Sequence, residues 1–218
     1  MKILGDDKYM NKHLNIFKEF DEHLLNDEKP SKYFNEIKKI GIFYNIYPFT
    51  LLGDLIGVPQ SPKHHPEGDV WNHTMLVVDY ASKKKKESKE PRAFMWAALL
   101  HDLGKARTTR LRKGKITSYN HDKVGKELVI NFLAYFDENK NFIKKVSALV
   151  RWHMQSLFVV KNMPYAEIEN MLKDVEPREI ALLTECDRLG RGGLTEEKIN
   201  SEKKNIDLFL YKITKYQI

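Results

Sequence analysis

The chain has 218 residues, of which 42% are hydrophobic and 31% are charged, as in proteins with a sizeable buried core. No apolar run approaches the ~20 residues of a membrane span, and residues 1–13 contain no apolar stretch of signal-peptide length, so we expect a cytoplasmic protein. The single cysteine, Cys186, excludes an internal disulfide. The formal net charge of +7 suits an anionic partner such as a phosphate ester or RNA, although a solvated lysine-rich surface explains it as well.

The N-terminal part is predicted to consist of helices joined by loops. Apolar residues at helical spacing predict helices over residues 11–25, 31–40 and 44–56. In the second of these, Phe34, Ile37 and Ile40 form one apolar face. Three prolines then make residues 58–68 an extended loop. Four histidines of this region are expected on helix surfaces or at the rim of a pocket: His13, His23, His64 and His65.

The next helix is predicted to begin at Asp69, because aspartate commonly caps helix N-termini. The apolar residues that follow recur at i, i+3 and i+4, which places His73 on the buried side. The run Lys83–Lys86 interrupts this pattern and is interpreted as a solvated linker. Pro91 is typical of a first helical turn, and the helix that it opens is predicted to reach Leu103.

One stretch in the second half is strand-like. Residues 108–119 alternate in polarity around Lys113-Gly114, which predicts a β-hairpin. Apolar spacing and first-turn prolines predict further helices after Asp122, over residues 142–152, from Pro164 onward, over 177–190 and over 195–218. The sequence therefore predicts an all-α fold that forms a single domain with one small inserted hairpin.

Two adjacent residues with metal-binding side chains, His101 and Asp102, follow the most apolar helical run of the chain. Since the residues from Met95 to Leu100 belong in a core, the pair should face a buried or half-buried cavity. Gly104 follows where a helix usually ends. Neighbours on a helix point about 100° apart, so one ion beyond the helix end can bind both side chains. The alternative is a helix C-terminus that binds a cationic imidazole and is capped locally by the carboxylate.

Further metal-capable residues occur at helix ends or on inner helix faces. The full set, from five elements, is His73, His101, Asp102, His121, His153 and Asp187. Singly, each has a simpler explanation, such as a hydrogen-bonded core histidine, a loop residue, or an ion pair of Asp187 with Arg188. Together they predict a helical bundle with a shared pocket that binds one or two first-row divalent ions.

The order His…His-Asp…Asp, here His73, His101-Asp102 and Asp187, resembles the HD superfamily of metal-dependent phosphohydrolases. Residues 57–73, 101–109, 119–125 and 150–154 are also similar to the HD domain of bacterial CCA-adding tRNA nucleotidyltransferases. Their nucleotidyl-transfer head has a Gly-Gly followed by Arg-Asp, and an Asp-x-Asp pair; this sequence has neither, and its only Gly-Gly is Gly192-Gly193. We therefore expect an HD module without nucleotidyltransferase activity.

The resemblance covers about residues 37–193 and implies an HD-domain helical bundle. We expect one HD-type domain over residues 1–218, with helices from residues 1–36 and 195–218 packed on that core. It implies hydrolysis of a nucleotide phosphoester, namely a 2′,3′-cyclic nucleotide, a 2′-nucleotide or a related phosphomonoester. The metal is Mn, Fe, Co, Ni, Zn or Mg, which the sequence does not distinguish.

Roles for individual residues follow from the same resemblance. The principal metal is assigned to His73, His101, Asp102 and Asp187, and a second metal or the phosphate to His121 and His153. Asp102 is also the candidate general base. Three cationic side chains are candidates for binding the phosphate, with Lys105 also in a catalytic role: Lys105, Arg188 and Arg191.

Three alternatives remain open. The first is a 5′-nucleotidase or a hydrolase of a signalling nucleotide with the same fold. The second is a non-catalytic tRNA- or RNA-binding module that retains the pocket, against which the intact ligand set argues. The third is a structural metal site, which four ligands usually close.

Trp71 and Trp152 lie next to candidate ligands and either pack in the core or stack on a base. The oligomeric state is not predicted, although the amphipathic C-terminal helix suits pairing with a second copy.

Overall fold

Helix α6 (Pro91–Leu100) lies at the centre of the fold because almost all of its side chains are apolar. Every residue from Ala93 to Leu100 is buried. Four helices pack around it: α1 (Leu4–Asn26), α5 (Val70–Lys84), α9 (Lys140–Trp152) and α12 (Pro177–Leu189). The structure is a computed structural model that describes the backbone of residues 4–216 and the side chains of residues 11–216. Residues 1–3 and 217–218 of the predicted domain lie outside this range.

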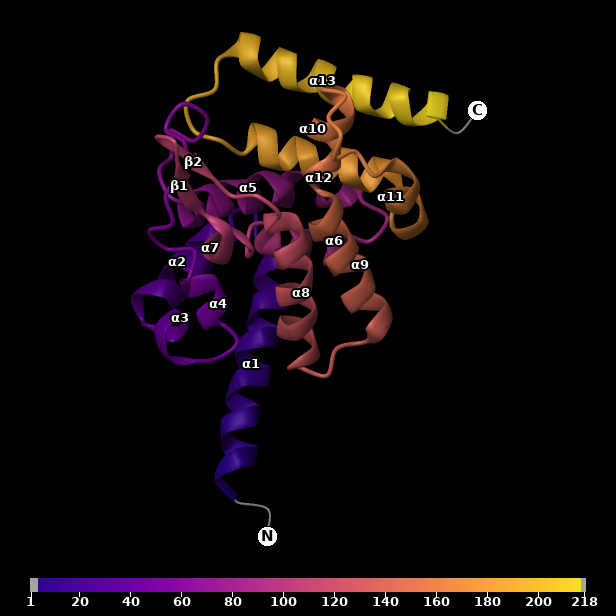
Figure 1. Cartoon of the computed structure of the whole chain (residues 1–218). Coiled ribbons are helices and arrows are strands. Elements are labelled where there is room, and N and C mark those ends of the chain that lie inside the picture. Colours follow the sequence, from indigo (N-terminus) through magenta and orange to yellow (C-terminus); the bar gives the residue numbers. More distant parts are fainter. Residues whose placement is uncertain (1–3, 217–218) are drawn as a thin grey trace.

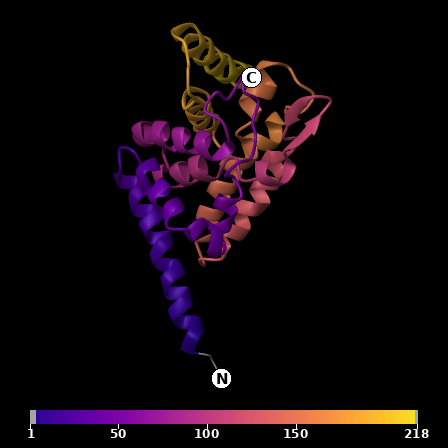
Figure 2. The same cartoon turned by 90° about the vertical axis from the view of Figure 1, so that its left-hand side faces the viewer.

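The remaining elements pack around these five helices. They are α2 (Ser31–Lys39), α3 (Ile42–Asn45), α4 (Thr50–Gly53), the 3-10 helix η1 (Lys85–Glu87), α7 (Lys105–Thr108), β1 (Arg110–Arg112), β2 (Lys115–Thr117), α8 (His121–Ala134), α10 (Gln155–Val160), α11 (Ile168–Asp174) and α13 (Glu196–Tyr216). Helix α1 extends beyond the other helices at its N-terminal end, and α13 lies across the opposite end against α10 and α12 (Figures 1 and 2). The all-α fold with one small hairpin is confirmed.

The hairpin and the start of α5 follow from local sequence. Strands β1 and β2 pair antiparallel, with Lys113 and Gly114 both at positive φ in the turn, as a two-residue type I′ connection requires. At the start of α5, Asp69 Oδ1 accepts a hydrogen bond of 2.9 Å from the Asn72 N–H, which confirms the predicted cap. No helix within residues 4–216 is long and apolar enough to cross a membrane.

Two predictions about helix boundaries are wrong. The run Lys83–Lys86 is not a linker, because α5 continues to Lys84, whose ammonium group pairs with Glu87 and Glu185. Pro164 does not open a helix. It lies between α10, for which the sequence shows no helical pattern, and α11. Helix α10 has six residues, too few to show a helical repeat in the sequence.

Three further predictions, one for a whole segment and two for single residues, are also wrong. The segment 44–56 contains no continuous helix, only the end of α3 and the one-turn α4. Ile40 follows the last residue of α2 and is 69% exposed, so it does not belong to that helix's buried face. His13, expected at the surface, is only 2% exposed, and its Nδ1 forms a 2.8 Å hydrogen bond with the Tyr135 hydroxyl.

Candidate metal centre

The six candidate ligands occupy helix ends that meet beside α6. His101 directly follows α6 and His153 directly follows α9. His121 is the first residue of α8. His73 lies in the first part of α5 and Asp187 near the end of α12, and all six side chains are buried. The structure therefore brings together every residue that the sequence proposed as a ligand.

Three of the four imidazoles are oriented in the same way, by a backbone carbonyl three residues earlier in the chain. The distances from Nδ1 to the carbonyl oxygen are 2.9 Å for His101 and Ala98, 2.7 Å for His121 and Ser118, and 2.6 Å for His153 and Val150. For His101 and His153 the acceptors are carbonyls of the last helical turn, which lack helical partners. Since a carbonyl only accepts, each Nδ1 carries the hydrogen, and a neutral ring then presents a lone pair at Nε2.

The four Nε2 atoms converge on Asp102, which lies between them. Its Oδ2 is 3.2 Å from Nε2 of His101 and 3.9 Å from Nε2 of His73. Its Oδ1 is 3.6 Å from Nε2 of His121 and 4.0 Å from Nε2 of His153. Asp187 also lies at this end of the His73 ring, with its Oδ1 atom 3.1 Å from Nε2.

This donor set fits a divalent cation. Among the described residues, Nε2 of His101 is buried without a hydrogen-bond partner. Nε2 of His121 and Nε2 of His153 lie only 3.1 Å apart, although both rings already donate through Nδ1. Neutral rings would therefore point lone pairs at one another and at an ionised carboxylate, an arrangement that a cation stabilises. Mixed imidazole and carboxylate ligands suit first-row divalent metals.

The two carboxylates are held in the ionised form that metal ligands require. Burial by itself raises the pKa of Asp102, but the positive charges of His101 and Lys105 more than offset it and hold the pKa well below its usual range. Burial also raises the pKa of Asp187, but the positive charges of Arg191 and Arg188 more than offset it and hold that pKa well below its usual range. Both carboxylates are therefore negatively charged at neutral pH.

The imidazoles differ in their preferred protonation state. Burial lowers the pKa of His153 to about 3, with a further contribution from the neighbouring imidazoles. Burial also lowers the pKa of His121. For His101 the penalty of burial is outweighed by the adjacent carboxylate of Asp102, so that its pKa is raised. Without a metal, a proton on His101 therefore supplies part of the positive charge that the cluster attracts.

The three cationic candidates lie at the same site. Lys105 Nζ is 2.7 Å from Asp102 Oδ2 and donates to Gln60 Oε1 at 2.8 Å. Arg191 binds Asp187 through two contacts, Nη2 to the carboxylate and Nε to the backbone carbonyl, each 3.1 Å long. Arg188 Nε is 3.6 Å from the other oxygen of Asp187. All three cations thus border the metal-ligand candidates.

An open cavity of about 1270 Å³ leads to this cluster. Its floor includes Asp102, His121, His153 and Asp187. Part of its lining is largely apolar and comes from α10 and the residues on either side of it: Met154, Leu157, Phe158, Met163, Pro164 and Tyr165. Cationic side chains line other parts of the cavity: Lys63, Lys105, Lys123, Lys161, Arg188, Arg191 and Lys198. His64 and His65 also line it, which confirms their predicted place at a pocket rim.

Two features of the site were not foreseen. Glu67, in the loop before α5, forms hydrogen bonds with His73 and His65, and no periodic pattern marks a loop carboxylate. Gly104 does not end a helix in the left-handed conformation but precedes α7. A Cβ atom there would lie 2.0 Å from the His121 backbone oxygen, so glycine is required for the close approach of α8.

Trp71 and Trp152 are buried and donate to Asn35 and Asp174, so both pack in the core.

Comparison with known proteins gives a consistent result. The family model for the HD domain matches residues 70–204, more than half of the chain. A Multifunctional CCA protein from Methylobacillus flagellatus is 28% identical over 182 residues, which are 80% of this chain and 42% of that protein. A Multifunctional CCA protein from Actinobacillus pleuropneumoniae is 41% identical over 83 residues, 38% of this chain and 20% of that protein. The chain thus spans from a fifth to less than half of the length of these two curated relatives.

Proposed function

We propose that this chain, which belongs to the HD domain family, hydrolyses nucleotide phosphoesters with the aid of a bound divalent metal. The observation that carries the proposal is the buried ring of imidazole Nε2 atoms around the ionised Asp102, which opens into a cavity bordered by cations. A closed structural site would leave no such opening.

His73, His101, Asp102 and Asp187 would hold the principal metal, and His121 and His153 a second one or the phosphate. Asp102 suits a bridging position because its two oxygens face different imidazoles. A divalent metal bound there supplies Lewis acidity and lowers the pKa of water from ~15.7 towards ~7, so that hydroxide is available at neutral pH. The low pKa of Asp102 favours its role as a ligand, and its role as general base stays a prediction.

Phosphate recognition is assigned to the three cations beside the ligands. Lys105 offers a compact positive charge, and its amine is positioned by Gln60. Arg191 and Arg188 both contact Asp187, so a phosphate that binds them would share the guanidinium groups with that carboxylate. Arginine suits this role because its planar group binds two oxygens at once.

The apolar part of the cavity lining supports a nucleoside as the group attached to the phosphate. Phe158 and Tyr165 lie edge to face, with ring centroids 5.7 Å apart, and both line the cavity. Such rings offer a surface for a base, while the floor binds the phosphate. We propose 2′,3′-cyclic nucleotides, 2′-nucleotides or related monophosphates as substrates, and one domain over residues 1–218 as the functional unit.

A panel of phosphoesters tests this proposal. The chelator-treated protein is assayed on 2′,3′-cyclic nucleotides and on 2′-, 3′- and 5′-monophosphates, with Mn, Fe, Co, Ni, Zn and Mg supplied one at a time. We expect hydrolysis of a cyclic or 2′-substrate that depends on an added metal. The His101→Ala protein, purified identically, controls for contaminating phosphatases. Preference for a 5′-monophosphate would favour the 5′-nucleotidase alternative. Salt-sensitive tRNA binding without turnover of any ester would favour the RNA-binding module.

A further inference from the structure

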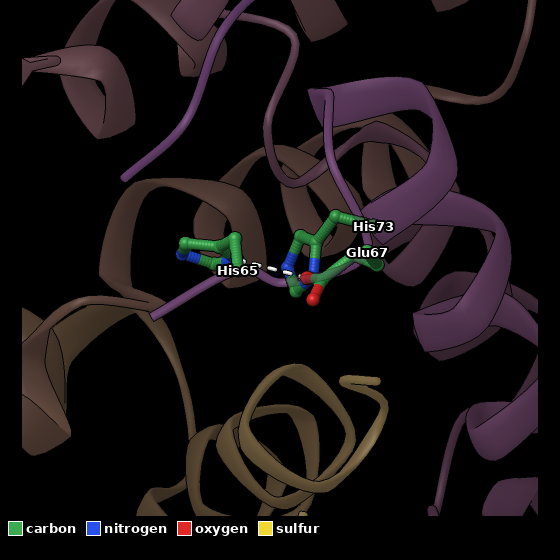
Figure 3. Close-up of side chains that lie close together, drawn as sticks. All are labelled: His65, Glu67 and His73. Carbon is green, nitrogen blue, oxygen red and sulfur yellow. Dashed lines mark hydrogen bonds and ion pairs between the residues drawn. The ribbon is translucent and has the colours of Figure 1, made fainter. Parts of the chain in front are cut away.

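Glu67 lies in the proline-rich loop that leads into α5, and its side chain is only 4% exposed. Its Oε1 atom accepts hydrogen bonds from Nδ1 of His73 at 2.9 Å and from Nδ1 of His65 at 3.0 Å (Figure 3). Its Oε2 atom is 3.4 Å from the backbone N–H of Gly192, in the loop after α12. One buried carboxylate therefore joins a candidate metal ligand to the loop that carries Arg191.

His73 needs such a partner because of its place in a helix. The other three imidazoles bind a backbone carbonyl three residues earlier. His73 lies within α5, where the equivalent carbonyl of Val70 accepts from the Thr74 hydroxyl at 2.8 Å and lies in the helical hydrogen-bond ladder. For His73, the carboxylate of Glu67 accepts the hydrogen bond in place of a backbone carbonyl.

The geometry assigns Glu67 as the positioning residue of His73: it holds the hydrogen on Nδ1, so that the Nε2 lone pair faces the metal site beside Asp102. This inference rests on the proposed metal site. An imidazole ligand commonly donates its second nitrogen to a carboxylate, which fixes the ring and increases the basicity of the ligating nitrogen.

Direct ligation by Glu67 is the competing explanation, because His65, Glu67 and His73 lie close enough together to surround an ion. The contacts of 2.9 and 3.0 Å have hydrogen-bond lengths and meet at one oxygen atom. A cation at that point would require His73 to bridge two metals through both nitrogens, since its Nε2 atom already faces Asp187 and Asp102. The structure therefore favours hydrogen bonding.

The test measures metal affinity, which does not depend on turnover. Binding of Mn²⁺ to chelator-treated protein is followed by calorimetry for the wild type, Glu67→Ala and Glu67→Gln. We expect Glu67→Ala to weaken the tightest binding about 10- to 100-fold. Glu67→Gln should recover part of this loss, because its amide oxygen still accepts from Nδ1. The matched control is Glu202→Ala, which removes a carboxylate that lines the same cavity but pairs with Lys198.

Two further readouts separate positioning from general damage to the fold. Thermal unfolding of the metal-free proteins should change little between Glu67→Gln and the wild type. In the Zn²⁺-bound wild type, the Nδ1 proton of His73 should be protected from solvent exchange in NMR spectra, and in Glu67→Ala it should exchange freely. His65→Ala should leave the affinity within about twofold, because the bond to His73 remains.

The possible failures are distinguishable. If the wild type binds no divalent metal, the proposed function and this inference both fail. If it binds Mn²⁺ but Glu67→Ala binds it equally well, only the positioning role is wrong. If Glu67→Ala and His65→Ala both lose one metal equivalent, Glu67 is a ligand and the positioning role is again overturned.

Discussion

The two sides of Asp102 differ in charge. On the carboxylate side, defined by His73, His101 and Asp187, imidazoles alternate with ionised carboxylates, and the pKa of His101 is raised. On the imidazole side, defined by His121 and His153, two neutral rings face each other across 3.1 Å, and burial lowers the pKa of both. Only Asp102 contributes negative charge to both sides.

The difference suggests unequal affinity for two cations. A divalent ion on the carboxylate side is attracted by two ionised groups in a buried environment, where charge interactions are strong. An ion on the imidazole side shares one carboxylate oxygen and two neutral nitrogens. We therefore expect a tight site next to His101 and a weaker site next to His153, with Asp102 bridging them.

Removal of the shared carboxylate should break both sides at once. Asp102→Asn keeps the shape of the side chain but removes its charge and one acceptor oxygen. Loss of a hydrogen-bond partner of a metal ligand lowers activity by up to about 100-fold. Because Asp102 is itself a proposed ligand, we expect a larger fall in turnover and the loss of metal binding at both sites. Steady-state kinetics and calorimetry measure the two effects. Asp102→Asn protein that keeps wild-type turnover would rule out a metal role for this residue.

Single imidazole replacements should separate the two sides. His101→Ala is expected to weaken the tighter metal binding at least about 100-fold, since it removes a direct ligand. His153→Ala should leave that affinity within about threefold and remove only a weaker equivalent. Titration with Mn²⁺ distinguishes these results, and helical circular dichroism should remain close to that of the wild type in both. Equal loss in the two variants would mean that the sides form one site.

The pH dependence of metal binding should follow the carboxylate side. Because the pKa of His101 is raised in the metal-free protein, protons compete with the metal as the pH falls through that value. The low pKa of His153 keeps it deprotonated across the same range. We expect affinity to fall about tenfold per pH unit on the acidic side. Calorimetry in buffers of different ionisation enthalpy should detect a released proton, and His101→Ala should release less.

A backbone change should disturb the imidazole side alone. In Gly104→Ala the new methyl group would lie 2.0 Å from the His121 carbonyl oxygen, so α8 has to move. We expect a loss of about 1–3 kcal/mol in the free energy of unfolding, measured by denaturant titration. The tighter metal affinity should persist while the weaker one declines. Unchanged stability would show that α8 can move away from Gly104 without cost, which would contradict tight packing at this contact.

The helical framework could be predicted because it depends on local patterns. The buried position of His73 follows from apolar spacing, and the start of α5 follows from Asp69. The position of the hairpin turn follows from Lys113-Gly114. Each of these features is encoded within a few neighbouring residues.

The features that were missed depend on contacts between distant segments. Glu67 is separated from the Gly192 that it contacts by 125 positions, and no repeat in the sequence links them. Gly104 has the composition of a helix end but is required by packing against His121. His13 lies on a helix with exposed neighbours, but its ring packs against Phe49 and Tyr135, which are distant in the sequence. Such contacts emerge only when the chain is folded.

The most direct test of the central claim is anomalous diffraction from crystals of the protein grown with Mn²⁺. A strong peak should lie between His73, His101, Asp102 and Asp187, within coordination distance of their ligand atoms. A weaker peak near His121 and His153 would support the second site. Ordered crystals with no peak among these side chains, at metal concentrations that saturate activity, would contradict the account.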